Sequence, residues 1–263
     1  MRRDNYYPRA EKDIFSGCLW RVIDTGIHNP YMNMAIDEAL AAGGQDGPPV
    51  FRFYDWLSPS ISIGYGQRVN QVIDRQLCVA DNIPVVRRPT GGGVVFHGID
   101  ITYSVVLQPG MAADIYDAYK KVQSRIQRAF AQMGVAIKLY SNIEKHDLSG
   151  FCFISPNFGD LMVRGKKLGG MAARRKGGKI LCQGYIYADD AAVFTRYCRV
   201  GCSLNEKAVS LRVIGLKREK VKEQITASWA EDITAGGLND EEKARAEYLY
   251  ESKYNQDKWN YRR

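Results

Sequence analysis

The chain of 263 residues has little of what builds a metal site or a disulfide framework. It has three histidines, and none of its six cysteines (18, 78, 152, 182, 198 and 202) forms a CxxC pair. A structural zinc site is therefore not expected. A chain of this length buries enough core to fold without disulfide staples, so we expect most of the cysteines to be reduced core residues. We assign no role to Cys198 or Cys202.

Long uncharged apolar runs are also missing. The first residues, Met1–Pro8, lack the apolar core of a signal peptide, and no later stretch is apolar enough to cross a bilayer. We therefore expect a soluble, cytoplasmic protein that does not bind membranes. The net charge of +8 favours acidic partners. No RNA-binding or zinc-finger pattern accompanies this charge, so a nucleic-acid-binding protein is the least favoured interpretation.

What is present is a succession of short strand-like and helix-like segments. Alternating and β-branched runs predict strands at 19–24, 50–54, 60–65, 85–88, 94–96, 101–106, 138–140, 160–163 and 179–181. Apolar spacing predicts helices from Asn29-Pro30 to Gly43, over 72–78 and over 114–133. We expect an α+β fold, with mixed or antiparallel sheets flanked by helices.

The expected organisation has three parts. Residues 1–17 form a polar N-terminal arm, 18–216 a catalytic domain, and 217–263 a helical extension packed on that domain. In the extension, Asn239 and Glu242 have the spacing of a capping box at the start of a helix. No internal repeat or low-complexity linker divides the chain.

The most informative segment is Arg87-Arg88-Pro89-Thr90-Gly91-Gly92-Gly93-Val94-Val95-Phe96-His97. Consecutive glycines mark backbone that takes a positive φ or lies close to another group. Amides in such a turn can face a carbonyl oxygen, a carboxylate or a phosphate, and the arginines add fixed positive charge. The spacing is equally typical of a glycine-rich hairpin turn.

A second segment holds a cysteine between two phenylalanines, Phe151-Cys152-Phe153, followed by the basic stretch 164–179. Taken alone, such a cysteine is usually a buried apolar residue, and a lysine pair in a turn is usually solvated. Together the two segments also allow a nucleophile, because nearby positive charge lowers the pKa of a thiol and a thiolate is the reactive form.

These motifs resemble the lipoate/biotin protein ligase and lipoyl-octanoyl transferase superfamily. The resemblance extends from Trp20–Asp24 and Asn33–Leu40 through Phe51–Tyr54 to the end of the chain at Trp259–Arg262. The Cys-Phe dipeptide, and a basic turn starting at Gly165, are similar to the octanoyltransferases of the LipM type. This resemblance implies that Cys152 carries the acyl group as a thioester and that Lys167 lowers its pKa and orients the acyl carbonyl.

The sequence departs from that type at several positions. Gly93-Val94-Val95-Phe96 is closer to ATP-dependent lipoate ligases, Gly98 replaces an acidic residue, and Met171 replaces a common serine. The pairs Lys166-Lys167 and Arg174-Arg175 resemble amidotransferases that use octanoylated H protein as the donor. A ligase must consume ATP to activate a free acid and has no need of a cysteine opposite the lysine, so Cys152 favours the transferase.

The resulting hypothesis is transfer of an octanoyl group from acyl carrier protein, through Cys152, to a lysine of an apo lipoyl domain of the glycine cleavage H protein type. No cofactor and no metal are implied. Burying six methylenes of the acyl tail contributes ~5 kcal/mol at ~0.8 each. The candidate substrate-binding residues are Arg88, the loop Gly91, Gly92 and Gly93, and Gly170 and Ala172, whose backbone would stabilise the oxyanion. His97 is either a proton shuttle or a structural imidazole.

Overall fold

The computed structural model describes residues 15, 17–44, 47–142, 156–199, 207–229 and 233–262. Most of the predicted N-terminal arm lies outside these ranges. The predicted nucleophile Cys152 and the unassigned Cys202 also lie outside the described residues.

Eleven strands are present in the described part of the chain: β1 (Trp20–His28), β2 (Val50–Trp56), β3 (Ser60–Ile63), β4 (Val85–Arg87), β5 (Val95–His97), β6 (Asp100–Leu107), β7 (Lys138–Leu139), β8 (Leu161–Val163), β9 (Lys166–Lys176), β10 (Lys179–Tyr187) and β11 (Ile233–Ala235). The helical elements are α1 (Pro30–Ala42), α2 (Val69–Val72), α3 (Arg75–Ala80), α4 (Ile115–Gln132), η1 (Ala191–Tyr197), α6 (Arg218–Trp229), α7 (Asp240–Leu249), η2 (Tyr250–Tyr254) and α8 (Asp257–Asn260).

The strands form two sheets. The larger one has the order β11-β1-β2-β6-β10-β9-β8-β7, and the smaller one has the order β4-β3-β5. In the large sheet β1 runs parallel to both of its neighbours, while the other pairs are antiparallel. The predicted α+β fold with mixed sheets is confirmed.

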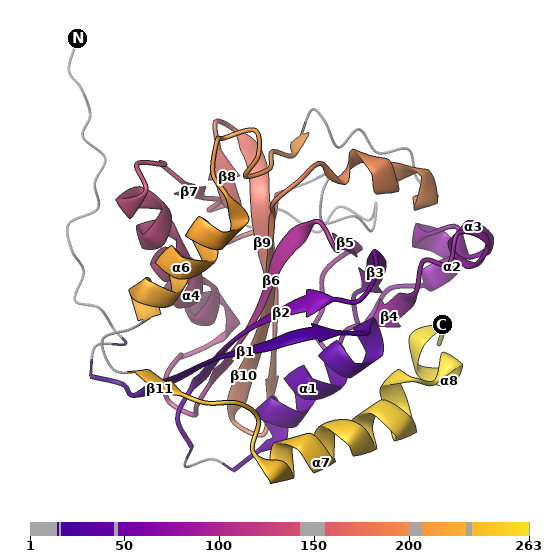
Figure 1. Ribbon diagram of the computed structural model, residues 1–263, viewed down its shortest axis with the longest axis horizontal. Helices are drawn as coiled ribbons and strands as arrows, with labels where there is room; N and C mark the ends of the chain where they lie inside the picture. Colours follow the sequence, from indigo (N-terminus) through magenta and orange to yellow (C-terminus); the bar gives the residue numbers. More distant parts are fainter. Residues whose placement is uncertain are drawn as a thin grey trace.

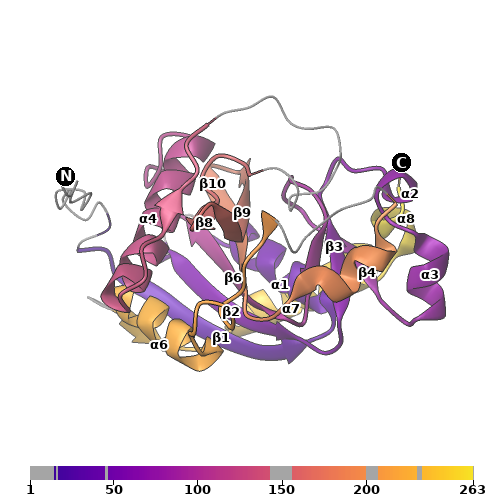
Figure 2. The same ribbon diagram turned by 90° about the horizontal axis from the view of Figure 1, so that it is seen from above.

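Helices cover both faces of the large sheet (Figures 1 and 2). Successive side chains of β6 point to opposite faces of the sheet, and both faces carry apolar residues. Tyr103, Val105 and Leu107 join the core beneath α4 and α6, whereas Val106 faces the opposite layer with α1 and α7. On that second face Asp100, Thr102 and Ser104 are buried polar residues. The polar end of this face is the one that the small sheet covers, and it is there that a cavity opens.

The helix boundaries follow the caps that the sequence contains. Asn29 caps α1 by accepting from the Met32 amide, with Pro30 in the first turn. In α7 both halves of the predicted capping box are present, between Asn239 and Glu242. The predicted helix over 114–133 is α4, which Asp114 caps.

One prediction of local structure is wrong. The basic turn expected to start at Gly165 is short: positive φ is confined to Arg164 (φ 50) and Gly165 (φ 80), and an 11-residue strand, β9, follows at once. Pairing with the neighbouring strands overrides the local composition there. The C-terminal extension is helical as predicted, with α6, α7 and α8, and it also contributes β11, which pairs in parallel with β1 at the edge of the large sheet.

Candidate active site

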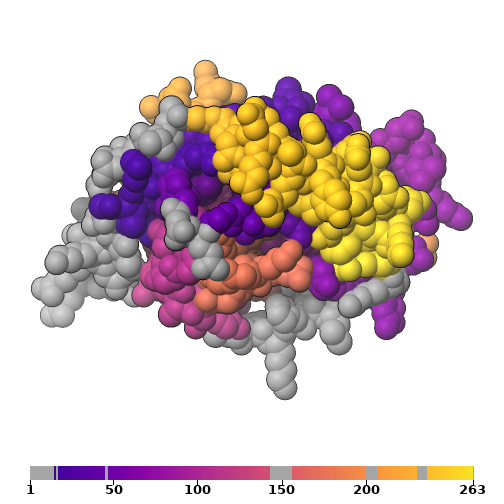
Figure 3. Space-filling view, turned by 90° about the horizontal axis from the view of Figure 1, so that it is seen from below, coloured from indigo at the N-terminus to yellow at the C-terminus, as the bar shows by residue number. Residues whose placement is uncertain are grey.

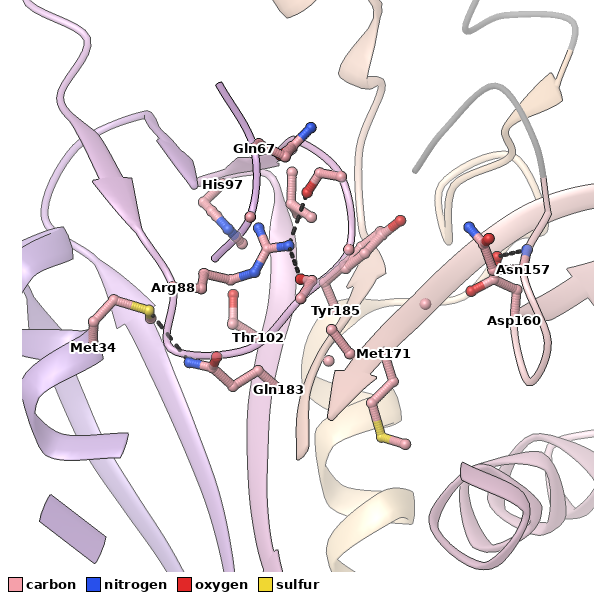
Figure 4. A pocket seen from close by; sticks show the side chains of 18 of the residues that line it. Met34, Gln67, Arg88, His97, Thr102, Asn157, Asp160, Met171, Gln183 and Tyr185 are labelled. Atoms are coloured by element: carbon pink, nitrogen blue, oxygen red, sulfur yellow. Dashed lines mark hydrogen bonds between the residues drawn. The ribbon is translucent and has the colours of Figure 1, made fainter. Parts of the chain in front are cut away.

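A cavity of about 640 Å³ lies between the small sheet and the face of β9 and β10 (Figure 4). It brings together every predicted site residue that the structure describes. Those residues are Arg88, Gly91, Gly92, Gly93, His97, Lys167, Gly170 and Ala172. They come from segments that are up to 84 positions apart in the sequence (88 to 172), so their convergence on one cavity is a property of the fold.

The glycine-rich segment is a crossover between β4 and β5, and not a hairpin turn. Both strands pair with β3, which lies between them, so they do not pair with each other. Gly92 has a φ of 82°, and a Cβ on Gly64 would lie 1.9 Å from the Gly92 carbonyl oxygen. The close approach of these two backbones therefore requires glycine at position 64.

Arg88 holds this loop in place. Its guanidinium donates to the Gly91 carbonyl at 2.9 Å and to the Gly93 carbonyl at 2.8 Å, and its other edge donates to the Ser62 hydroxyl at 2.7 Å. The side chain is 5% exposed. Arg88 therefore shapes one wall of the cavity by fixing the backbone (Figure 4).

Lys167 lies on the opposite wall in a buried ion pair. Its ammonium is 2.6 Å from a carboxylate oxygen of Asp160, and both side chains are 3% exposed. Gly170 lies directly against the pair: a Cβ there would meet Asp160 Oδ1 at 2.6 Å and Lys167 Nζ at 3.1 Å. The glycine leaves the space that the two charged groups occupy.

Asp160 is the site residue that the sequence argument missed. The Asn157 amide donates to its carboxylate at 2.6 Å. Burial raises the pKa of this carboxyl group above its usual value, although Lys167 and the Asn157 amide oppose the shift. A signal did exist in the sequence: a turn at Arg164-Gly165 makes β8 and β9 a hairpin, with Leu161 opposite Gly169. Asp160, which precedes Leu161, then lies near Gly170 and near Lys167.

The polar floor of the cavity was also not predicted. Gln183 accepts from the Thr90 hydroxyl at 2.7 Å and donates to Asp37 at 2.7 Å. Asp37 is fully buried and forms an ion pair with Arg52. This network ties α1 and the glycine-rich segment to β10, and it keeps the buried polar groups of the floor hydrogen-bonded.

Both ring nitrogens of His97 are engaged by the protein. Nδ1 is 2.8 Å from Asp100 Oδ2 and Nε2 is 2.7 Å from the Ser62 hydroxyl. The ring stacks on Trp56 with centroids 3.9 Å apart. This arrangement favours the structural imidazole over the proton shuttle.

Burial lowers the pKa of His97 below its usual 6.5, so the folded protein protonates this ring less readily than the unfolded chain does. The unfolded chain then binds the proton more readily, so stability is lost as the pH falls below 6.5. We expect an NMR titration of His97 to give a midpoint below 6.5. A midpoint at or above 6.5 would contradict this expectation.

Two of the cysteines are unsuited to covalent catalysis. Burial raises the pKa of the Cys182 thiol to about 12 and that of Cys78 to about 11. Both side chains are core residues, as predicted. Cys18 and Cys198 are half-buried. No group of three potential metal ligands occurs within the described residues.

Comparison with known proteins identifies the family to which this fold and site belong. The model of the lipoyl protein ligase A/B catalytic domain matches residues 29–230. The chain belongs to this family. Curated relatives named octanoyltransferase LipM cover nearly the whole chain. The protein of Kyrpidia tusciae is 35% identical over 93% of this chain and 99% of its own, and that of Bacillus subtilis is 33% identical over 93% and 98%.

Solved structures of the family share the fold. A lipoate-protein ligase A bound with ATP superposes with a TM-score of 0.81 and 23% identity, over 93% of this chain and 98% of that one. A T. acidophilum protein with bound lipoic acid gives a TM-score of 0.80 and 23% identity, with the same coverage. At this identity the likeness supports the fold of the family and not a particular reaction. No helix in the described part of the chain is long and apolar enough to cross a membrane.

Proposed function

We propose that this protein is an acyltransferase that moves an octanoyl group onto a lipoyl-domain protein in lipoate biosynthesis. The observation that carries the proposal is the similarity, at 32–35% identity over 93% of the chain, to relatives named octanoyltransferase LipM. The cavity supports the proposal, because its lining includes Gly170 and Lys167, the residue to which the resemblance gives the role of orienting the acyl carbonyl.

In the proposed reaction the Cys152 thiolate attacks the thioester carbon of octanoyl-acyl carrier protein. A new S–C bond forms, the bond to the carrier sulfur breaks, and the carrier leaves as a thiolate that takes up a proton. The amine of the acceptor lysine then attacks the acyl-cysteine. An N–C bond forms, Cys152 is released, and the proton lost by the amine returns to the thiolate.

Lys167 has a charge role in both steps. Its ammonium stabilises the oxyanion of each tetrahedral intermediate, together with backbone amides at Gly170–Ala172. The register of the strands supports this assignment. Strand β8 pairs with β9 only as far as Gly169. Alternate amides of β9 point away from β10, its antiparallel neighbour on the other side. Amides on that side beyond Gly169 are the candidates for the oxyanion site.

The cavity suits a fatty acyl tail. Apolar side chains contribute to its lining: Met34, Trp56, Val72, Val95 and Tyr185. Burial of six methylenes contributes ~5 kcal/mol, enough to favour octanoyl over short acids. The net charge of +8 suits carrier proteins and lipoyl domains that are acidic.

The deciding experiment is intact mass spectrometry after mixing the protein with octanoyl-acyl carrier protein. We expect a hydroxylamine-labile octanoyl adduct that maps to Cys152 and is absent in Cys152→Ser. In Lys167→Ala the rate of adduct formation should fall by about 100-fold or more, because an electrostatic donor to the oxyanion is lost. Cys182→Ser is the matched control, since its thiol lies in the core; its adduct should form at the wild-type rate.

The alternatives give different outcomes. Lipoylation of an apo acceptor with lipoate and ATP by Cys152→Ser, at the wild-type rate, would replace the proposal with a lipoate ligase. Labelling of the acceptor by octanoylated H protein, but not by octanoyl-acyl carrier protein, would make the protein an amidotransferase.

A further inference from the structure

A cluster of cations and aromatic rings lies beside the cavity. We propose that this cluster, here called the cationic rim (Tyr65, Arg174, Lys253, Trp259 and Arg262), binds the phosphodiester through which an acyl carrier protein holds its thioester arm. The proposal rests on the proposed function, because it concerns the donor of the same reaction. It assigns a specific substrate-recognition role to the C-terminal segment.

The geometry of the rim is that of stacked cations. The guanidinium of Arg174 lies 4.5 Å from the centroid of the Tyr65 ring, and that of Arg262 lies 4.2 Å from the same ring. Arg262 is also 3.8 Å from the centroid of Trp259, and Lys253 Nζ is 3.9 Å from it. Coulomb repulsion between the like charges opposes this arrangement, and the attraction of each cation to an aromatic ring face offsets the repulsion.

Carboxylates within the described residues do not neutralise the two arginines. Glu38 pairs with Lys253 and Lys176, and the ion pairs of the rim involve no other acid. Arg174 donates to the Pro89 carbonyl, which is uncharged. Both arginines lower the pKa of the half-buried Tyr65, as expected of a site with excess positive charge. An anion placed here would gain charge-assisted hydrogen bonds.

The rim adjoins the cavity through two connections. Gly66, Gln67 and Arg68 line the cavity and directly follow Tyr65. On β9, residues 170, 172 and 174 share one face. Gly170 and Ala172 line the cavity, and because glycine has no side chain and alanine only a methyl group, neither residue blocks the strand face that continues to Arg174. In Figure 3 the yellow C-terminal segment borders the salmon-coloured strands of the β9–β10 region.

The length of this path matches the length of a carrier arm. Gly170 and Arg174 are four residues apart on an extended strand, which corresponds to about 13 Å. From its sulfur to its phosphorus, a phosphopantetheine arm has about thirteen bonds, equivalent to slightly more than four residues of extended backbone, or about 14 Å. A thioester beside Lys167 and Gly170 therefore places the phosphate within reach of Arg174 and Arg262.

The test compares octanoyl donors that differ only in the phosphate. Octanoyl-pantetheine and octanoyl-phosphopantetheine are supplied to the wild type, Arg262→Gln and Arg174→Gln, and KM and kcat for acylation of Cys152 are measured. We expect the wild type to have a KM about tenfold lower for the phosphorylated donor. Each variant should lose most of this difference, with kcat and the KM for octanoyl-pantetheine unchanged. The wild-type preference should also shrink as salt rises.

The matched control is Lys258→Gln, which removes an exposed cation from the same segment and should keep the full preference. Equal KM values for the two donors in the wild type would overturn the proposal, as would variants that impair both donors alike. A raised KM for the acceptor lipoyl domain alone would assign the rim to the acceptor and also overturn it. Acylation of Cys152 by octanoyl-pantetheine tests the proposed function separately, because it does not involve the rim.

Discussion

Replacing Asp160 with asparagine is expected to lower the free energy of unfolding by about 3 kcal/mol at neutral pH. The substitution keeps the size of the side chain and an oxygen that can accept from the Asn157 amide. It removes only the charge, and so takes from the buried ammonium of Lys167 the carboxylate with which it forms an ion pair. Chemical denaturation of the wild type and the variant measures the loss.

The double variant Asp160→Asn/Lys167→Met separates charge from packing. Removing both charges leaves no uncompensated ion, so much of the lost stability should return. A double variant as unstable as the sum of the single variants would contradict this account, because independent sites are additive and coupled sites are not. The remote and partly buried pair Arg21–Glu242 offers a control: Glu242→Gln should not depend on the residue at position 167.

The pH dependence of Asp160→Asn has a defined sign. Without the carboxylate, burial should depress the pKa of Lys167 in the folded variant below its value of about 10.4 in the unfolded chain. The unfolded chain then binds more protons, so the stability of the variant should rise with pH toward 10 relative to the wild type. A constant difference between the two proteins from pH 6 to pH 10 would show that Lys167 does not respond to Asp160.

The same substitution has a catalytic consequence under the proposed function. Asp160 is a positioning residue, since it touches Lys167 and holds the ammonium against the cavity wall. In Asp160→Asn the acylation rate should fall toward that of Lys167→Ala, with the loss growing as the pH rises and Lys167 deprotonates. A uniform loss at every pH would indicate a purely structural role.

The candidate site could be predicted in part because its parts are local in sequence. The glycine-rich segment and the basic stretch near Lys167 each stand out by composition, and the fold brings both to one cavity. Asp160 and Gln183 carry no such signal. Each becomes part of the site only through the register of β8, β9 and β10, and a shift of one residue would turn its side chain to the other face.

The adjacent residues Arg87 and Arg88 are a second case in which the position of a side chain depends on the strand and not on composition. By composition the pair is a single patch of positive charge, from which we predict substrate binding by Arg88. Alternation at the end of β4 sends the two side chains to different places. Arg88 turns to the glycine-rich loop, and Arg87 turns to the C-terminal segment. Composition alone cannot decide which arginine goes where.

Replacing Arg87 with methionine is expected to lower the free energy of unfolding by about 3 kcal/mol or more, because hydrogen bonds from a buried charged group are lost together. The Arg87 side chain is fully buried and donates to six backbone carbonyls. Three of these lie at Gly64, Tyr65 and Gln67, in the segment that leads into the cavity wall. The other three belong to the C-terminal residues Trp259, Asn260 and Arg262.

Arg87 thus joins two segments that together carry most of the cationic rim. Loss of its guanidinium should release the C-terminal segment before the rest of the protein unfolds, since buried carbonyls left without a donor favour hydration. Hydrogen exchange of amides in 254–262 is expected to accelerate in Arg87→Met, while amides of β6 and β10 stay protected. Arg75→Met is the control, because Arg75 contacts the same segment through a largely exposed pair with Asp257 and by stacking 3.8 Å from the centroid of the Tyr261 ring, and it should contribute only about 1 kcal/mol. Equal effects of the two substitutions would mean that burial of Arg87 does not anchor the segment.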